Sequence, residues 1–503
     1  MASKELMAAR LAEQERGAVI NGNEKPMFHL TPLCGWMNDP NGFSFYKGEY
    51  HLFYQYYPYD SCWNTMHWGH AVSKDLLRWK HMPAVLAPDT PWDEGGCFSG
   101  CAVELPDGRH LLMYTGLRRP VNDREESEAK NAGQMYLQVQ NLAIGDGTDY
   151  KKYSGNPVIG SDAVPESASK VDFRDPKILV NKDGTYTCLI AGRGPDGNGI
   201  IFMYRSEDGF TWKYWKPLTK NDGQFGIVWE CPDFFELEGK YIVLVSPMEM
   251  RPKGLEYHNG NISVALTGDY DEETGDFTQM YDQAIDYGID FYAAQTLKTP
   301  DGRRVLIAWM QNWDTCLMRN NPAPWAGQMT LPRELTFRDG RVYQRPVREL
   351  ENYYTNIVSY KKVPVSEEIE LYGVEGRTAD IEIEVNPAPG GPLYRKFAVW
   401  FAMDQENHSA VRFNPYDGTV KIDRKNAGSR KAIVHQRRCF VRESMDGHIR
   451  LRIILDRYSF EVFINDGRYV MSAVIPTELS AQKIVFRAEG KAIIDVTKRE
   501  IRL

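Results

Sequence analysis

The chain has few cysteines, no long hydrophobic run and no block of basic residues, and each absence excludes a class of protein. Eight cysteines in 503 residues, without the spacing of a zinc ribbon, predict reduced thiols in a cytoplasmic protein and argue against a disulfide scaffold. No apolar run is long enough to span a bilayer, and residues 1–25 lack the hydrophobic core of a signal peptide. The net charge of −8, with both signs interspersed, indicates that neither nucleic acid nor a membrane is a partner.

Long stretches of helical periodicity are also missing. Residues 1–25 are predicted to form an N-terminal arm or short helix, and short alternating strands separated by Gly, Asp and Pro turns follow to about residue 345. Aromatic residues make up 12% of the chain, which suits β-rich packing and clefts in which rings stack on sugars. The sequence therefore predicts an all-β protein.

One hairpin pattern recurs five times within residues 26–345. Each copy has two alternating strands around a turn that contains a glycine, and these glycines are Gly48, Gly108, Gly184, Gly239 and Gly302. Their separation leaves room for a four-stranded sheet in each unit. Five such sheets arranged radially predict a five-bladed β-propeller whose innermost strands line a central channel.

The pattern changes after Arg345-Pro346. Residues 346–360 are predicted to be a linker, and strictly alternating strands such as Asp380–Val385 and His448–Leu455 fill residues 361–503. Many short antiparallel strands with one apolar face favour a two-sheet β-sandwich.

A carboxylate stands in front of three of the five hairpins: Asp39, Asp175 and Glu230. Taken alone, Asp39 belongs to a turn sequence, Asp175 to an ion pair before a proline, and Glu230 is one partly buried glutamate among others. If every hairpin begins with an innermost strand, however, the three carboxylates meet at one end of the channel. Solvated loop acids have no reason to occupy equivalent positions in a repeat, so the conjunction favours a catalytic site.

The chemistry of acetal cleavage suits these carboxylates, since it needs one that attacks or stabilises the sugar carbon and an acid that protonates the leaving oxygen. Asp39, in a turn rich in backbone N–H groups, is expected to stay ionised and to act as the nucleophile. The flanking Trp229 and Cys231 are expected to give Glu230 an apolar setting, a raised pKa and the role of general acid. Arg174 is expected to keep Asp175 ionised for binding substrate hydroxyls.

Several segments together resemble glycoside hydrolase family 32, the β-fructofuranosidases or invertases. Trp36–Gly42, Phe173–Pro176 and Trp229–Cys231 look like the three signatures of that family. Four further segments also look like segments of that family: Phe98–Gly100, Asp290–Gln295, Met329–Leu335 and, in the C-terminal part, Glu461–Gly467. The resemblance covers the chain from about residue 26 onward, and Glu461 itself, on an alternating strand, is interpreted as structural.

The resemblance implies retaining cleavage of a terminal β-fructofuranosyl unit, without a metal or other cofactor. It gives Asp39 the role of nucleophile, Glu230 that of acid/base and Asp175 that of transition-state stabiliser. It also implies a fructose pocket formed by Asn38, Gln55, Trp63, Phe98, Ser99, Arg174, Tyr292 and Trp313. Without the resemblance, the rings in that set would be interpreted as blade packing.

Several substrates remain open at this point. The main hypothesis is hydrolysis of sucrose or short fructo-oligosaccharides, and a variant is hydrolysis of sucrose-6-phosphate, which would need a basic group beside the aglycone. Arg118-Arg119 is a candidate for that group, although a solvated loop pair is the simpler interpretation. Transfer to sugars, action on fructose dianhydrides, and a non-catalytic sugar-binding propeller are further alternatives, and a homo-oligomer is possible.

Overall fold

The computed structural model describes residues 2–165, 168–316, 323–428 and 434–503, and over these residues it is all-β with a few short helices. Helix α1 (Lys4–Gly17) is capped by Ser3, whose side chain accepts the Leu6 N–H, and it lies against β4. The second α-helix, α2 (Asp123–Asn131), was not expected from the sequence. Short 3₁₀ helices lie at Gly22–Glu24, Arg348–Tyr353 and Arg442–Ser444. No helix among the described residues is long and apolar enough to cross a membrane.

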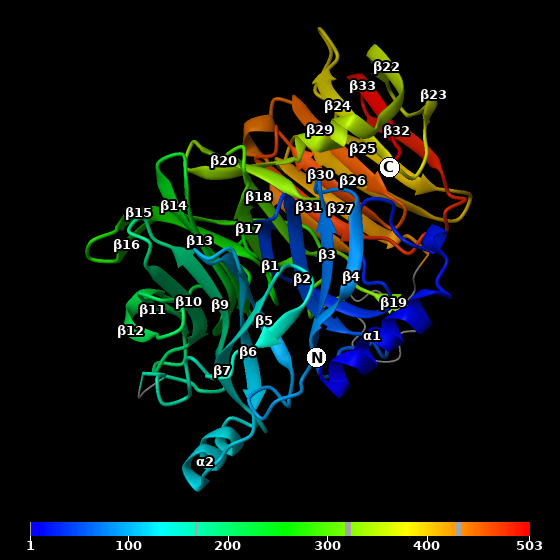
Figure 1. Ribbon diagram of the computed structural model, residues 1–503. Helices are drawn as coiled ribbons and strands as arrows, with labels where there is room; N and C mark the ends of the chain where they lie inside the picture. The colour runs from blue at the N-terminus through cyan, green and yellow to red at the C-terminus, as the bar shows by residue number, and fades with distance from the viewer. Residues whose placement is uncertain (1, 166–167, 317–322, 429–433) are drawn as a thin grey trace.

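Five sheets follow one another along the N-terminal part of the chain (Figure 1). The first contains β1 (Gly35–Tyr46), β2 (Glu49–Tyr57), β3 (His67–Ser73), β4 (Trp79–Leu86) and β19 (Trp325–Ala326), and the second β5 (Cys97–Glu104), β6 (His110–Arg118), β7 (Leu137–Gly145) and β8 (Tyr150–Lys152). The third contains β9 (Phe173–Val180), β10 (Tyr186–Arg193), β11 (Gly199–Ser206) and β12 (Lys213–Lys220), and the fourth β13 (Val228–Leu237), β14 (Lys240–Met248), β15 (Val264–Asp271) and β16 (Asp276–Ala284). The fifth contains β17 (Tyr292–Lys298), β18 (Arg304–Trp309), β20 (Arg333–Arg338) and β21 (Arg341–Pro346).

The first strands of these five sheets contact one another in a closed order. Strand β1 contacts β5 and β17, β9 contacts β5 and β13, and β13 contacts β17. Figure 1 shows these strands toward the middle of the N-terminal part, with outer strands such as β12 and β16 at its periphery. The five predicted hairpins are present as β1–β2, β5–β6, β9–β10, β13–β14 and β17–β18.

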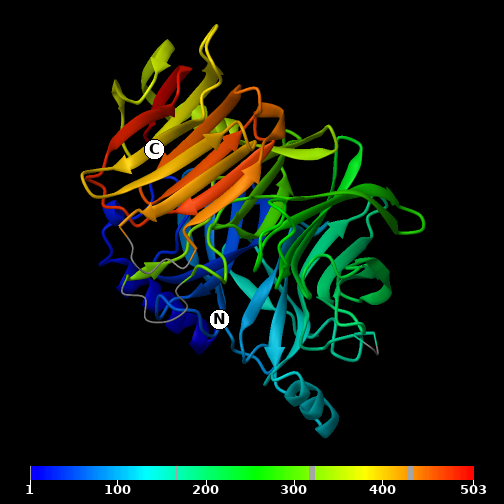
Figure 2. The ribbon, with the colours of Figure 1, turned by 180° about the vertical axis from the view of Figure 1, so that it is seen from behind.

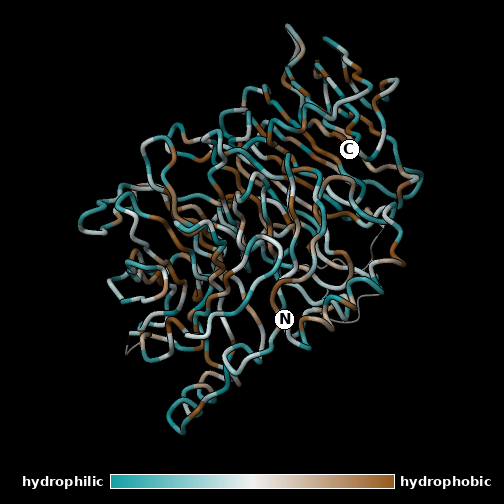
Figure 3. The backbone as a smooth tube through the Cα atoms, viewed as in Figure 1, coloured by the Kyte–Doolittle hydropathy of each residue, from teal (hydrophilic) through white to brown (hydrophobic). Residues whose placement is uncertain are grey.

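The C-terminal part contains two six-stranded sheets, seen from behind in Figure 2. One is formed by β22 (Tyr354–Val365), β33 (Ala492–Ile501), β24 (Ala379–Pro387), β29 (Ile449–Asp456), β30 (Ser459–Ile464) and β31 (Tyr469–Val474). The other is formed by β23 (Glu368–Glu375), β32 (Lys483–Glu489), β25 (Lys396–Met403), β26 (His408–Asn414), β27 (Thr419–Asn426) and β28 (Gln436–Phe440). Apolar residues of both sheets share one core, with the rings of Phe401 and Phe460 4.8 Å apart. Figure 3 shows hydrophobic segments in the interior of both parts and hydrophilic segments at many of the outer loops.

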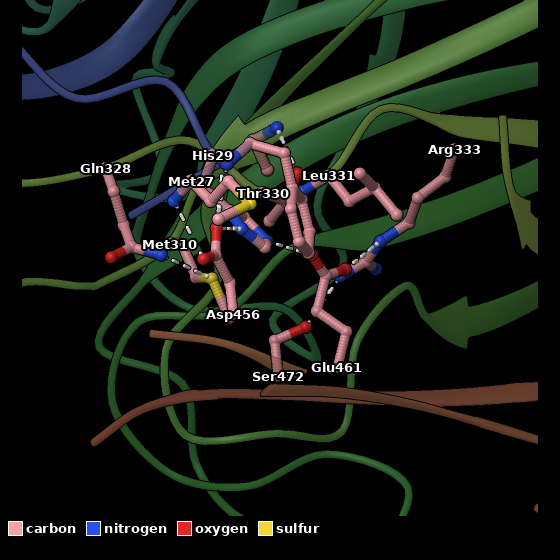
Figure 4. A network of polar contacts seen from close by, with 12 residues as sticks. Met27, His29, Met310, Gln328, Thr330, Leu331, Arg333, Asp456, Glu461 and Ser472 are labelled. Carbon is pink, nitrogen blue, oxygen red and sulfur yellow. Dashed lines mark hydrogen bonds and ion pairs between the residues drawn. The ribbon is translucent and has the colours of Figure 1, made fainter. Parts of the chain in front are cut away.

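A buried group of charges joins the two parts of the chain, and we call it the joining network: His29, Asp286, Arg333, Asp456 and Glu461. Figure 4 shows His29, Arg333, Asp456 and Glu461 of this set. The His29 ring lies 2.8 Å from Asp456 and 2.9 Å from Glu461. Arg333 donates to Glu461 at 2.8 Å and to Asp286 at 3.0 Å. Glu461 therefore has a structural role, because its carboxylate links the C-terminal part to two N-terminal segments.

Burial disfavours the charged imidazole of His29, but its bonds to Asp456 and Glu461 outweigh this and raise its pKa to about 9. Burial acts to raise the pKa values of Asp456 and Glu461, but His29 holds that of Asp456 below its usual range, and Arg333 and His29 do the same for Glu461. Backbone N–H groups of Met27 and Leu331 complete the carboxylate shells. The joining network is thus a paired and hydrogen-bonded set of charges, the form in which buried ions are tolerated.

Candidate active site

The motif segments lie inside strands, so the expectation that Trp36–Gly42 forms a turn before its hairpin is wrong. Those residues belong to β1, where the register with β2 shifts between Met37 and Pro40. Two residues, Asn38 and Asp39, therefore face the single residue Gln55 on β2. This arrangement is a β-bulge. Pro40 directly follows the bulge and is paired with Tyr54, so it lies at the kind of irregularity where proline is found in strands.

The same bulge recurs at the same place in all five first strands. Register shifts leave Phe98-Ser99, Asp175-Pro176, Cys231-Pro232 and Ala293-Ala294 unpaired in β5, β9, β13 and β17. Asp175, Cys231 and Ala293 have positive φ values of 62°, 49° and 57°, which are uncommon for residues other than glycine. The repeated bulge re-aims side chains that a regular strand would place in the sheet faces, and backbone strain of this kind clusters at active sites.

Asp39 is buried, and its Oδ2 accepts hydrogen bonds from the Ser99 hydroxyl at 2.9 Å and the Cys231 thiol at 3.6 Å. Its other oxygen, Oδ1, has no hydrogen-bond partner among the described residues. Burial and then the charge of Glu230 raise the pKa of Asp39 to about 6. The expected shell of backbone N–H groups is absent from the described contacts of this side chain, so that part of the electrostatic prediction is wrong.

Asp175 lies on the other side of the same thiol. Its Oδ2 is 3.5 Å from the Cys231 sulfur and accepts the Cys231 N–H at 2.8 Å. Burial and the charge of Glu230 raise its pKa to about 7, although Arg174 acts in the opposite direction. The expectation that Arg174 keeps this carboxyl strongly ionised is therefore wrong, and the guanidinium instead donates to Glu230 at 3.0 Å and to Asp172 at 3.2 Å.

Glu230 directly precedes the bulge of β13, and its side chain is 15% exposed. Arg174 bonds one of its oxygens, and the Tyr292 hydroxyl donates to the other at 2.7 Å. The predicted apolar setting is wrong, because a cation and a phenol contact the carboxylate directly. The Tyr292 oxygen also lies 2.9 Å from the Ser246 carbonyl, and Arg174 and Tyr292 contact Glu230 from the two sheets that neighbour its own.

Aromatic side chains surround the carboxylates. Trp63, Phe98 and Trp313 are half-buried and pack on a buried cluster that includes Trp36, Cys231, Tyr292 and Trp309. The Trp63 and Phe98 rings lie 6.3 Å apart at 70°, and the Trp309 and Trp313 rings 4.9 Å apart. The arrangement is a set of polar groups within aromatic walls, the usual composition of a site for a sugar.

Comparisons with known proteins agree with this geometry. Residues 29–346 match the glycosyl hydrolases family 32 N-terminal domain, and residues 349–501 match the C-terminal domain of the same family. The chain belongs to glycoside hydrolase family 32. Family membership makes it a glycosidase and confirms the resemblance predicted from the sequence.

Relatives of this family 32 member match it over nearly the whole chain. A raffinose invertase from Escherichia coli is 34% identical and covers 97% of both chains. A sucrose-6-phosphate hydrolase from Zymomonas mobilis is 33% identical over 99% of this chain and 96% of its own. The structure of a mutant family 32 β-fructofuranosidase from Bombyx mori, in complex with sucrose, is similar with a TM-score of 0.81, 33% identity and coverage of 100% and 99%.

The remaining predicted site residues lie beside the acids of this family 32 chain. Asn38 accepts the Trp36 ring N–H at 2.8 Å, and Gln55 faces the first bulge and donates to the Cys97 carbonyl at 3.0 Å. Sequence reasoning did not assign a role to Cys231, although its thiol lies between two of the carboxylates. Its position directly after Glu230 in the third motif was the available signal.

Arg118 is neither a solvated loop residue nor a free cation. It ends β6 and is buried against Glu125 of α2, with a 2.6 Å ion pair, and against Ser161. Arg119 is exposed, pairs with Glu94 at 3.2 Å and lies over the Tyr136 ring. The helix that holds Arg118 was missing from the sequence prediction, which is why its partner was not foreseen.

Proposed function

We propose that the chain is a retaining β-fructofuranosidase that cleaves terminal β-D-fructofuranosyl residues from sucrose or short fructo-oligosaccharides. The observation that carries this is the convergence on Cys231: carboxylate oxygens of Asp39 and Asp175 lie 3.6 and 3.5 Å from its sulfur, and Glu230 is its neighbour in sequence. Relatives named as an invertase and a β-fructofuranosidase support the same substrate class.

In the first step Asp39 attacks the anomeric carbon of the fructosyl unit. Its unbonded, buried Oδ1 suits attack, and with a pKa of about 6 the carboxyl is largely ionised at neutral pH. Glu230 donates its proton to the departing glycosidic oxygen as that bond breaks, leaving a fructosyl ester on Asp39.

In the second step the Glu230 carboxylate takes a proton from water, and the water oxygen attacks the anomeric carbon and releases Asp39. Arg174 and the Tyr292 hydroxyl bind the Glu230 carboxylate and hold it in position for this step. Asp175 binds sugar hydroxyls and stabilises the positive charge of the transition state. No step calls for a metal or other cofactor.

The fold supports this assignment when it is interpreted as a five-bladed β-propeller followed by a β-sandwich. The five sheets with a closed order of first strands fit blades around a channel, and the two C-terminal sheets with a shared core fit a sandwich. We assign residues 26–345 to the propeller and 361–503 to the sandwich, joined by 346–360 and preceded by the arm 1–25. A cytoplasmic location and a homo-oligomer stay predictions.

Methanolysis of sucrose by the purified protein tests the retaining mechanism. Methanol that replaces water in the second step must give methyl β-D-fructofuranoside if the enzyme retains configuration, and NMR identifies the anomer. Formation of the α anomer would contradict the proposal. Native activity in Asp39→Asn would contradict it as well.

Hydrolysis of sucrose-6-phosphate is the second candidate, because relatives at 33% identity carry that name. The ion pair with Glu125 engages Arg118, the basic group proposed from the sequence, and this argues against its role in binding phosphate. The ratio of kcat/KM for sucrose-6-phosphate and for sucrose decides between the two candidates. A strong preference for the phosphate would make the second one correct.

A further inference from the structure

Strand β9, which carries Arg174 and Asp175, is the edge of its sheet, and side chains of the neighbouring sheet take the place of a strand on its open side. The Phe173 N–H donates to Gln138 Oε1 at 2.7 Å, and the Phe173 carbonyl accepts from Gln140 Nε2 at 2.9 Å. Backbone groups at a buried edge need partners, and here two glutamines provide them.

The two glutamines and Thr115 form a continuous polar row. Gln138 and Gln140 are two residues apart on β7 and so face the same side, and Thr115 on β6 is paired in register with Gln140. The Thr115 hydroxyl donates to Gln140 Oε1 at 2.8 Å and accepts the Asp175 N–H at 2.9 Å. Thr115 and Gln140 are fully buried, so water cannot replace either bond.

This row acts at the point where the backbone is strained. Asp175 has a φ of 62°, a conformation that is unfavourable for a residue with a side chain, and its N–H bond to Thr115 holds it there. That conformation directs the carboxylate to the Cys231 N–H. Gln138 Oε1 also accepts from the Arg174 guanidinium at 3.4 Å, and Arg174 in turn contacts Glu230.

We propose that Thr115, Gln138 and Gln140 form a clamp that positions Asp175 and Arg174 for the reaction. The clamp rests on the proposed function, because it matters only if Asp175 and Glu230 perform it. The three residues are positioning residues, since they act on the carboxylates through the backbone and guanidinium of β9. A shift of about 1 Å in a catalytic group can cost about 100-fold in rate, so loss of the clamp should appear in kcat.

Steady-state kinetics on sucrose test the clamp with Thr115→Val, which keeps the side-chain shape and removes both hydrogen bonds. We expect kcat to fall by about 10- to 100-fold with KM changed by less than about 3-fold. Thr115→Ser, which keeps the hydroxyl, should restore kcat to within about 3-fold of the native value. Thr187→Val is the matched control: Thr187 is buried on β10 near the far turn, bonded to Asn181, and its loss should leave kcat unchanged.

The double variant Thr115→Val/Asp175→Asn separates positioning from a general loss of packing. If the clamp acts through Asp175, removal of Thr115 should cost less than about 3-fold once Asp175→Asn has been made. A full effect of Thr115→Val in that background, a native kcat in the single variant, or no recovery in Thr115→Ser would overturn the clamp. If Thr115→Val does not fold, Gln140→Met tests the clamp instead, because it removes the bond to the Phe173 carbonyl and the acceptor of the Thr115 hydroxyl. A fall in kcat is expected there too, and a native kcat would overturn the clamp.

The two proposals fail in different ways. If Asp175→Asn keeps native kcat, the role of Asp175 is wrong and the clamp is overturned with it. If Asp175→Asn loses kcat while Thr115→Val keeps it, only the clamp is overturned.

Discussion

Two clusters of three carboxylates lie in this molecule, and they differ in the cations that pair with them. In the joining network, His29 and Arg333 together pair with all three acids. The pKa values of Asp456 and Glu461 fall below their usual range, whereas burial raises the pKa of Asp286 despite its bond to Arg333. The catalytic cluster consists of Asp39, Asp175 and Glu230. Among the residues that the structure describes, only Arg174 forms an ion pair with one of these acids, and that acid is Glu230.

The difference shows how the same residue types can serve stability in one place and reactivity in another. Charges that are matched and hydrogen-bonded hold two parts of a chain together. Like charges that share one cation keep protons at unusually high pH, as the pKa values of about 6 for Asp39 and about 7 for Asp175 indicate. Such a cluster costs folding free energy and retains groups that exchange protons near neutral pH.

Removal of the acid in the catalytic cluster should have the largest effect. Glu230→Gln keeps the size of the side chain but cannot donate and take back a proton, so kcat on sucrose should fall by about 10³- to 10⁴-fold. Glu236→Gln is the control, because Glu236 is an exposed glutamate on the same strand. Loss of less than about 10-fold in Glu230→Gln would remove Glu230 from the mechanism.

Removal of the cation in the joining network should mainly affect stability. Arg333→Met leaves Asp286 and Glu461 buried without their shared partner, and the free energy of unfolding should fall by about 3–5 kcal/mol, measured by denaturant titration. Arg338→Met, on the same strand but exposed over the Tyr343 ring, should cost less than about 1 kcal/mol. Equal losses in the two variants would show that the network adds no stability.

The same substitution should have opposite effects in the two clusters. Asp39→Asn removes a carboxyl whose pKa rises on folding, so at pH 7 it should stabilise the protein by on the order of 1–3 kcal/mol. Between pH 3.8 and about 6 the folded carboxyl binds more protons than the unfolded one, so the gain should shrink as pH falls below 6. Asp456→Asn, in the joining network, should lower the free energy of unfolding at pH 7. A higher free energy of unfolding in Asp456→Asn would contradict the difference between the two clusters.

The pH dependence of the joining network should give an effect no larger than that of Asp39→Asn. The pKa of His29 is raised by folding, so its contribution is fully present below pH 6.5 and is lost as pH rises through about 9. The difference in unfolding free energy between the native protein and His29→Gln should therefore decline by roughly 1–3 kcal/mol from pH 6.5 to 9.5. A constant difference would mean that His29 is neutral in the folded protein.

The sequence by itself determined the all-β class, the five hairpins and the family, because alternation and glycine turns are local signals and the motifs are continuous segments. Asp39, Asp175 and Glu230 could be selected because each precedes one of the recurring hairpins, although the structure places Asp39 and Asp175 within a bulge and Glu230 directly before one. The tertiary structure decided what surrounds them. Bulges convert the expected turn at Asp39 into a strand, and the cation beside Asp175 in sequence bonds Glu230 instead. Neighbouring sheets contribute Thr115 and Tyr292, residues that no local pattern marks. Electrostatic environment depends on groups far apart in the chain, and only their packing fixes which charges meet.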